Sequence, residues 1–162
     1  MAESKPKSLP SEQKLIFSED AEPFHSKKYR EAIGSLIFAI TCTRSDISWI
    51  VSKLAVYSQS PTVQHWTAVK NVFRYLKGTL EYKSCFQKCE DGLKLTGFID
   101  ADWGGSEDKK STSGYCFRLN KKGAAISWKS RKQPTVALFT CEAAYIATTV
   151  ATQEARFLLV IK

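Results

Sequence analysis

Basic and aromatic residues that could bind an anionic partner are concentrated in residues 103–162. This stretch carries ten Lys and Arg against four Asp and Glu, so it supplies +6 of the net charge of +8. Lys109 with Lys110 and Arg131 with Lys132 could contact phosphates, or could equally form a plain solvated surface. The ring of Trp103 could stack on a base, although packing is the usual role of an aromatic residue at a strand end. Nucleic acid is therefore the partner class that the charge favours.

Two carboxylates, Asp100 and Asp102, stand two residues apart where apolar and polar residues alternate. In a β-strand this spacing puts both side chains on the same face, roughly 6–7 Å apart. The pair could have a chemical role, or it could simply polarise the point where a strand passes into a turn. The residue types alone leave both interpretations open.

The composition excludes several other classes of protein. The five cysteines are scattered without a C-x-x-C pair, and only two histidines accompany them, which favours buried free thiols over a zinc site or disulfides. The longest apolar stretch, residues 32–42, is far shorter than the roughly 20 residues of a membrane-spanning helix. Because the N-terminus has no apolar segment typical of a secretory signal, we expect no membrane association and an intracellular location.

The first half of the chain reads as an arm followed by helices. Residues 1–28 are polar with isolated apolar residues, including those at 15–17, and predict an extended arm. Apolar residues then recur at helical spacing in three pieces between Tyr29 and Gly78. Ser60 and Pro61 predict the start of the third helix, and Gly78 predicts its left-handed cap. Their apolar stripes are Ile33, Leu36, Ile37, Ile40; Ile47, Ile50, Val51, Leu54; and Trp66, Val69, Phe73, Leu76.

After Gly78 the apolar period changes from helical to two. Residues 93–100, 114–119 and 124–128 predict three strands joined as antiparallel hairpins, the second hairpin through a turn at 120–123. Helical spacing returns from Thr135 to Val160 through Leu138, Tyr145, Ile146, Thr149 and Leu158. The predicted class is mixed, α+β or α/β, with a three-helix unit followed by three antiparallel strands and one long helix.

Ordered motifs along these elements resemble a known family. The first set resembles the end of the reverse-transcriptase region of copia-type retrotransposon Pol polyproteins: residues 29–36 (YREAIGSL), 43–48 (TRSDIS), 65–66 (HW) and 74–79 (RYLKGT). The second set resembles the start of the ribonuclease H domain of the same polyproteins: residues 100–105 (DADWGG), 110–115 (KSTSGY), 126–128 (ISW) and 132–138 (KQPTVAL). The resemblance implies three parts: the arm at 1–28, a helical reverse-transcriptase tail at 29–79 and a partial ribonuclease H-like domain at 92–162.

The resemblance also implies what chemistry to look for. The family hydrolyses the RNA strand of RNA–DNA hybrids with two Mg²⁺ ions held by converging carboxylates. Asp100 matches the first of these carboxylates, with Asp102 as a second candidate metal ligand. Ala144 stands where the family has its glutamate, and Glu142 points nearly opposite because two helical residues rotate a side chain by about 200°. Two later family carboxylates have no counterpart in the 162 residues, and no paired-aspartate polymerase strand occurs.

Three hypotheses follow for the function. The first is a truncated, catalytically inactive Pol segment that binds no Mg²⁺ and retains weak binding of RNA–DNA hybrids. The second is an active ribonuclease H when a longer product or a partner supplies the missing carboxylates. The third is a protein-interaction module that no longer binds nucleic acid. Ala144 favours the first hypothesis over the second.

The resemblance further implies an uncovered sheet edge. In the family fold a later strand pairs beside the opening strand, so residues 93–100 would lie at an edge with unpaired backbone groups. The helix side chains of Tyr145, Ile146, Leu158 and Leu159 would also lose part of the layer on which they pack. We therefore expect self-association or aggregation, unless the arm at 1–28 covers this edge.

Overall fold

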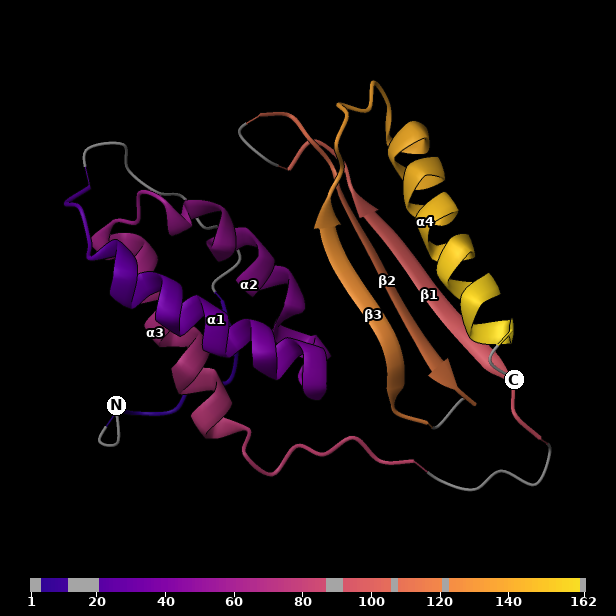
Figure 1. Ribbon diagram of the computed structural model, residues 1–162, viewed down its shortest axis with the longest axis horizontal. Helices are drawn as coiled ribbons and strands as arrows, with labels where there is room; N and C mark the ends of the chain where they lie inside the picture. The colour runs from indigo at the N-terminus through magenta and orange to yellow at the C-terminus, as the bar shows by residue number, and fades with distance from the viewer. Residues whose placement is uncertain (1–3, 12–20, 87–91, 106–107, 121–122, 161–162) are drawn as a thin grey trace. The chain divides into compact units, whose positions relative to one another are not determined.

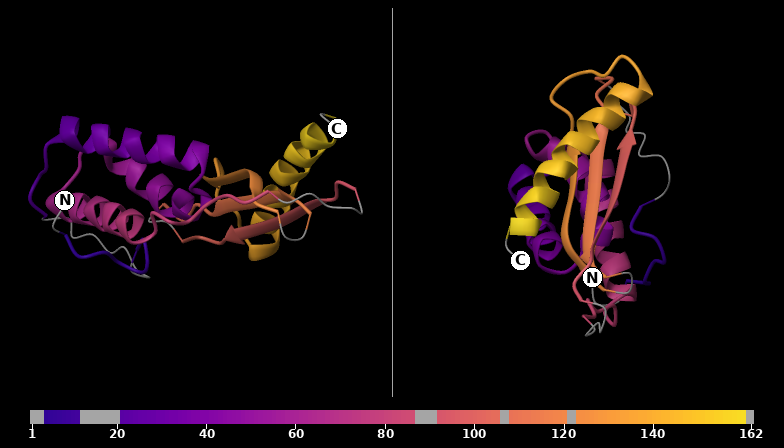
Figure 2. Two further views of the ribbon diagram at one scale, coloured as in Figure 1. Left: turned by 90° about the horizontal axis from the view of Figure 1, so that it is seen from below. Right: turned by 90° about the vertical axis from the view of Figure 1, so that its right-hand side faces the viewer.

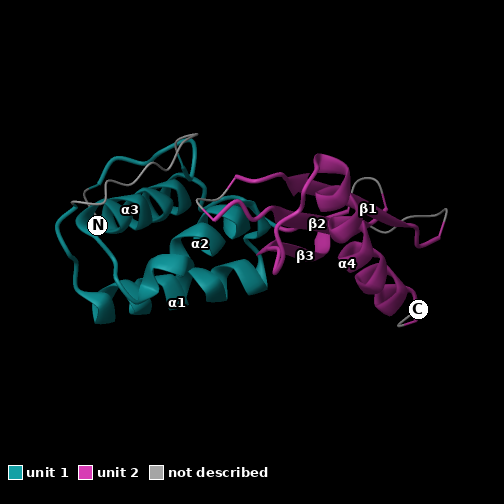
Figure 3. Cartoon of the chain, turned by 90° about the horizontal axis from the view of Figure 1, so that it is seen from above, with its two compact units in different colours: residues 1–83 teal, residues 84–162 magenta. Residues whose placement is uncertain are grey.

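The chain folds into two compact units, residues 1–83 and residues 84–162 (Figure 3). The computed structural model describes residues 4–11, 21–86, 92–105, 108–120 and 123–160. The predicted features at 15–17, Cys89 and the turn residues Lys121 and Lys122 lie outside these ranges. Among the helices described, none combines the length and apolarity needed to span a membrane.

The first unit contains the three predicted helices with two short 3₁₀ turns between them (Figure 1). The elements are α1 (Ser26–Cys42), η1 (Ser45–Ile47), α2 (Ser48–Ala55), η2 (Val56–Ser58) and α3 (Val63–Gly78). Their shared core consists of Tyr29, Ile33, Leu36, Ile47, Ile50, Val51, Leu54, Val69, Val72 and Tyr75. The stripe predicted for α2 is buried as expected.

The stripes predicted for the other two helices are partly wrong. In α1 the buried set begins with Tyr29, and Ile37 is 46% exposed. In α3 the buried face contains His65, Val69, Val72 and Tyr75, while the predicted Phe73 only packs at its flank. The amphiphilic residues Tyr29 and Tyr75 fill core positions because each hydroxyl finds a hydrogen-bond acceptor, Leu54 O for Tyr29 and Asp46 Oδ2 for Tyr75.

The ends of α3 differ from the predicted caps. The N-cap is Thr62, whose side chain accepts from the backbone N–H of His65, while Nδ1 of His65 accepts from the N–H of Thr62 at 2.9 Å. This reciprocal pair replaces the predicted cap at Ser60 and gives His65 a structural role. Gly78 does not adopt the predicted left-handed conformation. A Cβ at Gly78 would lie 3.0 Å from the carbonyl oxygen of Lys7, so the glycine admits the N-terminal segment instead.

Parts of the segment before α1 lie along α3. The backbone N–H of Lys7 donates to Arg74 O at 3.2 Å, and Nε of Arg74 donates to Lys5 O at 2.7 Å. Further along the chain, Pro23 forms an isolated β-bridge with Thr62. The described parts of the predicted arm are thus held to the helical unit by hydrogen bonds of the backbone and of the Arg74 side chain.

In its described residues, the second unit is a three-stranded antiparallel sheet with one long helix, as the periodicity predicted (Figures 1 and 2). The strands β1 (Leu95–Asp102), β2 (Thr112–Leu119) and β3 (Ala125–Lys132) lie in the order β1-β2-β3, and α4 (Thr140–Val160) packs on β1 and β2. Each element differs from its predicted bounds by a few residues, most clearly at the start of α4. The helix α4 begins at Thr140 and not at the predicted Thr135, because residues 135–139 form a loop.

The face of α4 that meets the sheet is not the predicted one. Ala143, Ala147 and Ala151 are buried, whereas the predicted Tyr145 is 76% exposed. Alanines at every fourth position let the helix approach the strands closely, and the larger apolar side chains therefore lie on its other faces. On the sheet face that meets the helix, Gly97 and the buried Phe117 are register partners on neighbouring strands. A Cβ at Gly97 would collide with the ring of Phe117.

This close approach predicts a large effect of Gly97→Ala. The ring of Phe117 is 4% exposed and cannot move aside cheaply, so the free energy of unfolding should fall by about 1–3 kcal/mol. The matched control is Gly114→Ala on β2, where the nearest atom to a new Cβ is Lys129 O at 3.8 Å and the effect should be small. Urea unfolding of the full chain measures both. Equal stabilities of the two variants would contradict the packing described.

Candidate functional site

The predicted site residues gather at one end of the sheet, where β1 ends, β2 begins and β3 ends. The register pairs Asp102 with Thr112, and Thr112 with Lys132. One step further in, Asp100 pairs with Gly114. Because side chains alternate along a strand, Asp100, Asp102 and Lys132 share one face of the sheet.

This face is the one that α4 leaves open. The helix contacts the other face, where Ser127 Oγ donates to Glu154 Oε1 at 2.6 Å and Phe117 is buried beside Ser127 in the register. Gly97 is the register partner of Phe117 and so lies on the α4 face. Asp100 is three residues further along the strand, so its side chain lies on the opposite face. Both candidate carboxylates are therefore solvent-facing, and both are exposed.

Lys132, a predicted phosphate contact, is engaged by a carboxylate. Its Nζ lies 2.8 Å from Oδ1 of Asp108, and this oxygen also accepts from the backbone N–H of Lys110 at 3.4 Å. The hydrogen bond from Lys132 lowers the pKa of the Asp108 carboxyl below its usual value. An exposed ion pair of this kind is weak, so an incoming phosphate could displace Asp108 from Lys132.

The structure separates the basic residues that the sequence grouped. Arg131 pairs with Ser113 and so lies on the α4 side of the sheet, opposite to Lys132. Lys109 and Lys110 lie in the connection between β1 and β2, with Lys109 in a left-handed conformation at φ 59°. Lys109, Lys110 and Lys132 therefore belong to the same end of the sheet. Arg131 is also near this end, but its side chain lies on the face that α4 covers.

Trp103 combines a structural contact with an exposed ring. Its Nε1–H donates to Ala137 O at 3.1 Å, which ties the exit of β1 to the loop before α4. The side chain is nevertheless 49% exposed. Packing and base stacking are thus compatible at this residue.

Two residues that the sequence analysis did not single out organise this end of the sheet. Ser111 is fully buried, and its hydroxyl accepts from the N–H of Gly104 at 3.3 Å. Gln133 donates from its backbone to Ser111 O, and from Nε2 to Ser113 Oγ and Ala143 O at 2.8 and 2.9 Å. Ser111 belongs to the motif at 110–115 and Gln133 to the motif at 132–138, so membership of these motifs was the sequence signal that could have identified them.

The residues present do not fit a two-metal site. Ala144 is exposed on α4 with no ligating atom, and Oε2 of Glu142 already accepts from the N–H of Leu138 at 2.6 Å. Within the described parts of the chain, no three His, Cys, Asp or Glu side chains gather so as to hold a metal ion. Asp100 and Asp102 alone leave most of an Mg²⁺ coordination shell to water.

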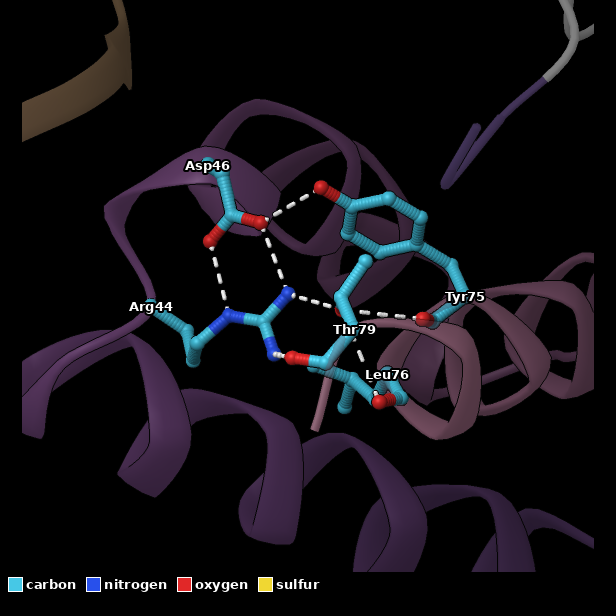
Figure 4. Close-up of polar contacts among 5 residues, drawn as sticks. All are labelled: Arg44, Asp46, Tyr75, Leu76 and Thr79. Atoms are coloured by element: carbon cyan, nitrogen blue, oxygen red, sulfur yellow. Dashed lines mark hydrogen bonds and ion pairs between the residues drawn. The ribbon is translucent and has the colours of Figure 1, made fainter. Parts of the chain in front are cut away.

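The first unit contains a polar network that the sequence analysis also missed (Figure 4). Arg44 makes a bidentate contact with Asp46, from Nε at 3.0 Å and from Nη2 at 2.8 Å. The hydroxyl of Tyr75 donates to Asp46 at 2.7 Å, and Nη2 of Arg44 reaches Thr79 Oγ1 at 2.6 Å. The network joins the turn after α1 to the C-terminus of α3. Its members come from the motifs at 43–48 and 74–79, so those motifs have a structural explanation.

Comparison with known proteins gives relatives but no solved structure. The chain is 43% identical to "Secreted RxLR effector protein 161" of Plasmopara viticola over 133 residues, which cover 82% of this chain and 92% of that protein. It is 45% identical over 75% of its length to "Retrovirus-related Pol polyprotein from transposon TNT 1-94" of Nicotiana tabacum, and 41% identical over 73% to the polyprotein from transposon RE2 of Arabidopsis thaliana. The matched segments span only 9% and 8% of these polyproteins. No family model and no solved structure matches.

The Arg44 network predicts a specific loss of stability in acid. Burial raises the pKa of the Asp46 carboxyl, but the hydrogen bonds from Arg44 and Tyr75 outweigh it and hold the pKa below its usual value. A carboxyl whose folded pKa is depressed stabilises the fold above its unfolded pKa, and this contribution disappears as the pH falls through the folded pKa. Asp46→Asn should therefore cost about 1–2 kcal/mol at neutral pH, and the difference from the wild type should shrink in acid.

Urea unfolding at several pH values measures this difference. The control is Asp108→Asn, which removes only the exposed pair with Lys132 and should change stability little at any pH. A destabilisation by Asp46→Asn that stays constant down to strongly acidic pH would show that the charge of Asp46 is not what matters.

Proposed function

Because the chain belongs to the family of copia-type retrotransposon Pol sequences, we propose that it is a Pol-derived protein whose second unit is a catalytically inactive, ribonuclease H-like domain. The family resemblance predicted from the motifs is confirmed by these relatives. The four α-helices and the three-stranded antiparallel sheet of the part that the structure describes are compatible with a partial fold of this mixed class.

The absence of a carboxylate at position 144 carries the proposal of inactivity. Two-metal hydrolysis needs several carboxylates converging on one phosphate, because each ion must be fixed on either side of the scissile bond. This chain offers Asp100 and Asp102 on the open sheet face and a methyl group at Ala144. Glu142 does not take this position, since two residues along the helix turn its side chain by about 200° and its Oε2 accepts a hydrogen bond from the N–H of Leu138.

We further propose weak binding of nucleic acid at the end of the sheet that carries Trp103. Lys109, Lys110 and Lys132 belong to this end of the sheet, Trp103 is half-exposed at the exit of β1, and residues 103–162 have an excess of basic charge. Such a surface attracts phosphates by counterion release. The nearby Asp100, Asp102 and Asp108 oppose it, which is the reason to expect weak affinity.

The first experiment tests for catalysis. The purified chain should not cleave an RNA–DNA hybrid in Mg²⁺ or Mn²⁺, under conditions where a cellular ribonuclease H does so. The physical reason is the incomplete ligand set around Asp100. Metal-dependent cleavage that disappears in Asp100→Asn would overturn the proposal of inactivity and favour the active-enzyme hypothesis.

The second experiment tests for binding. Affinity for a labelled hybrid should fall steeply with salt, and the double substitution of Lys110 and Lys132 by Ala should reduce the salt slope by about one unit per lost phosphate contact. Lys27→Ala on α1, an exposed lysine of the first unit, is the control and should have little effect. An affinity that barely changes with salt would instead support the protein-interaction hypothesis.

A further inference from the structure

The outer edge of β1 is open to solvent. β1 lies first in the sheet order, and among the residues that the structure describes no strand pairs with its other side. Gly97, Phe98, Ile99 and Asp100 are all exposed, with Phe98 at 50% and Ile99 at 44%. Apolar side chains on an exposed edge favour pairing with another strand.

The hydrogen bonds at the start of β1 identify the backbone groups on this edge. The N–H of Lys94 donates to Oδ1 of Asn120 at 2.9 Å, and the C=O of Lys94 accepts from the backbone N–H of Asn120 at 2.7 Å. Both backbone groups of Lys94 therefore point toward β2. Successive residues of an antiparallel strand direct these groups to alternate sides. The groups of Leu95, Gly97, Ile99 and Ala101 therefore point outward.

We propose that two copies of this chain pair through β1, antiparallel, with Phe98 of one copy opposite Phe98 of the second. In this register Gly97 bonds with Ile99 of the second copy, and Leu95 bonds with Ala101. All four are residues whose backbone groups point outward. Shifting the register by one residue would set outward groups against residues that already bond to β2, so the backbone excludes it.

The side chains are also self-complementary in this register. Asp102 lies opposite Lys94 of the second copy and Asp100 lies opposite Thr96, while the two Phe98 rings meet at the two-fold axis. Each Phe98 ring is already held by Arg118, whose guanidinium carbon lies 4.5 Å from the ring centroid. Opposite charges and aromatic pairs across strands are stabilising.

The neighbouring permitted registers are less favourable. Moving by two residues in one direction places Phe98 opposite Asp100, which buries an aromatic ring against a carboxylate. Moving by two in the other direction places Phe98 opposite Thr96 and Asp100 opposite Lys94. Only the proposed register combines the aromatic pair with two copies of an opposite-charge pair, which is why we assign a second copy of this chain as the occupant of the edge.

The wild-type test uses the full chain after nuclease treatment. Sedimentation velocity across a concentration series should show a monomer–dimer equilibrium. Hydrogen exchange at high concentration should slow the outward amides of Gly97 and Ile99 relative to a dilute sample. A monomer at every concentration, with these amides unchanged, would overturn the proposal, as would association that depends on residual nucleic acid.

Charge exchange identifies the register. Lys94→Asp should raise the dimer dissociation constant about tenfold, because two attractive pairs become repulsive. Adding Asp102→Lys should restore the dimer, whereas adding Asp100→Lys should not. Rescue by Asp100→Lys instead would overturn the register and indicate the one with Thr96 opposite Phe98.

A matched control separates the edge from general charge effects. Lys129→Asp makes the same charge change on β3, the other edge strand, and should leave the dissociation constant unchanged. An equal weakening by Lys129→Asp and Lys94→Asp would show that association does not run through β1. If a substituted chain does not fold, the exchange of the wild-type amides still decides the question.

Discussion

The close packing of α4 on the sheet is the contact on which the second unit depends. Ala143, Ala147 and Ala151 present only methyl groups to the strands, and Gly97 leaves room for the buried ring of Phe117 beneath them. Because this contact occupies one face of the sheet, strand alternation commits Asp100 and Asp102 to the other face. The position of the candidate site on the open face of the sheet follows from it.

Much of what the motifs encode is structural. Arg44, Asp46, Tyr75 and Thr79 close the helical unit through one hydrogen-bonded network, and Ser111 with Gln133 ties the strand ends to α4. The contacts of these residues hold the fold together. Folding alone is therefore a sufficient reason for a chain to keep these motifs.

The two proposed interactions, binding of nucleic acid and pairing with a second copy, use different parts of β1. At the end of β1, next to the basic connection to β2, the proposed binding of nucleic acid would be governed by charge and would depend on salt. The middle of β1 carries Phe98 and Ile99, where exposed apolar surface and outward backbone groups dominate. The two proposed surfaces meet at Asp102, which would oppose phosphate binding but would complement Lys94 of a second copy.

The sequence by itself determined the order of elements, because periods of 3.6 and 2 residues are local properties of the chain. It also determined the family, because the motifs occur in a fixed order. Tertiary structure decided which faces are buried: α4 turns its alanines inward, and α3 is rotated so that Tyr75 enters the core with its hydroxyl satisfied. It also separated Arg131 from Lys132 and moved the cap of α3 to Thr62. These outcomes depend on partners distant in sequence, which hydrophobic periodicity does not contain.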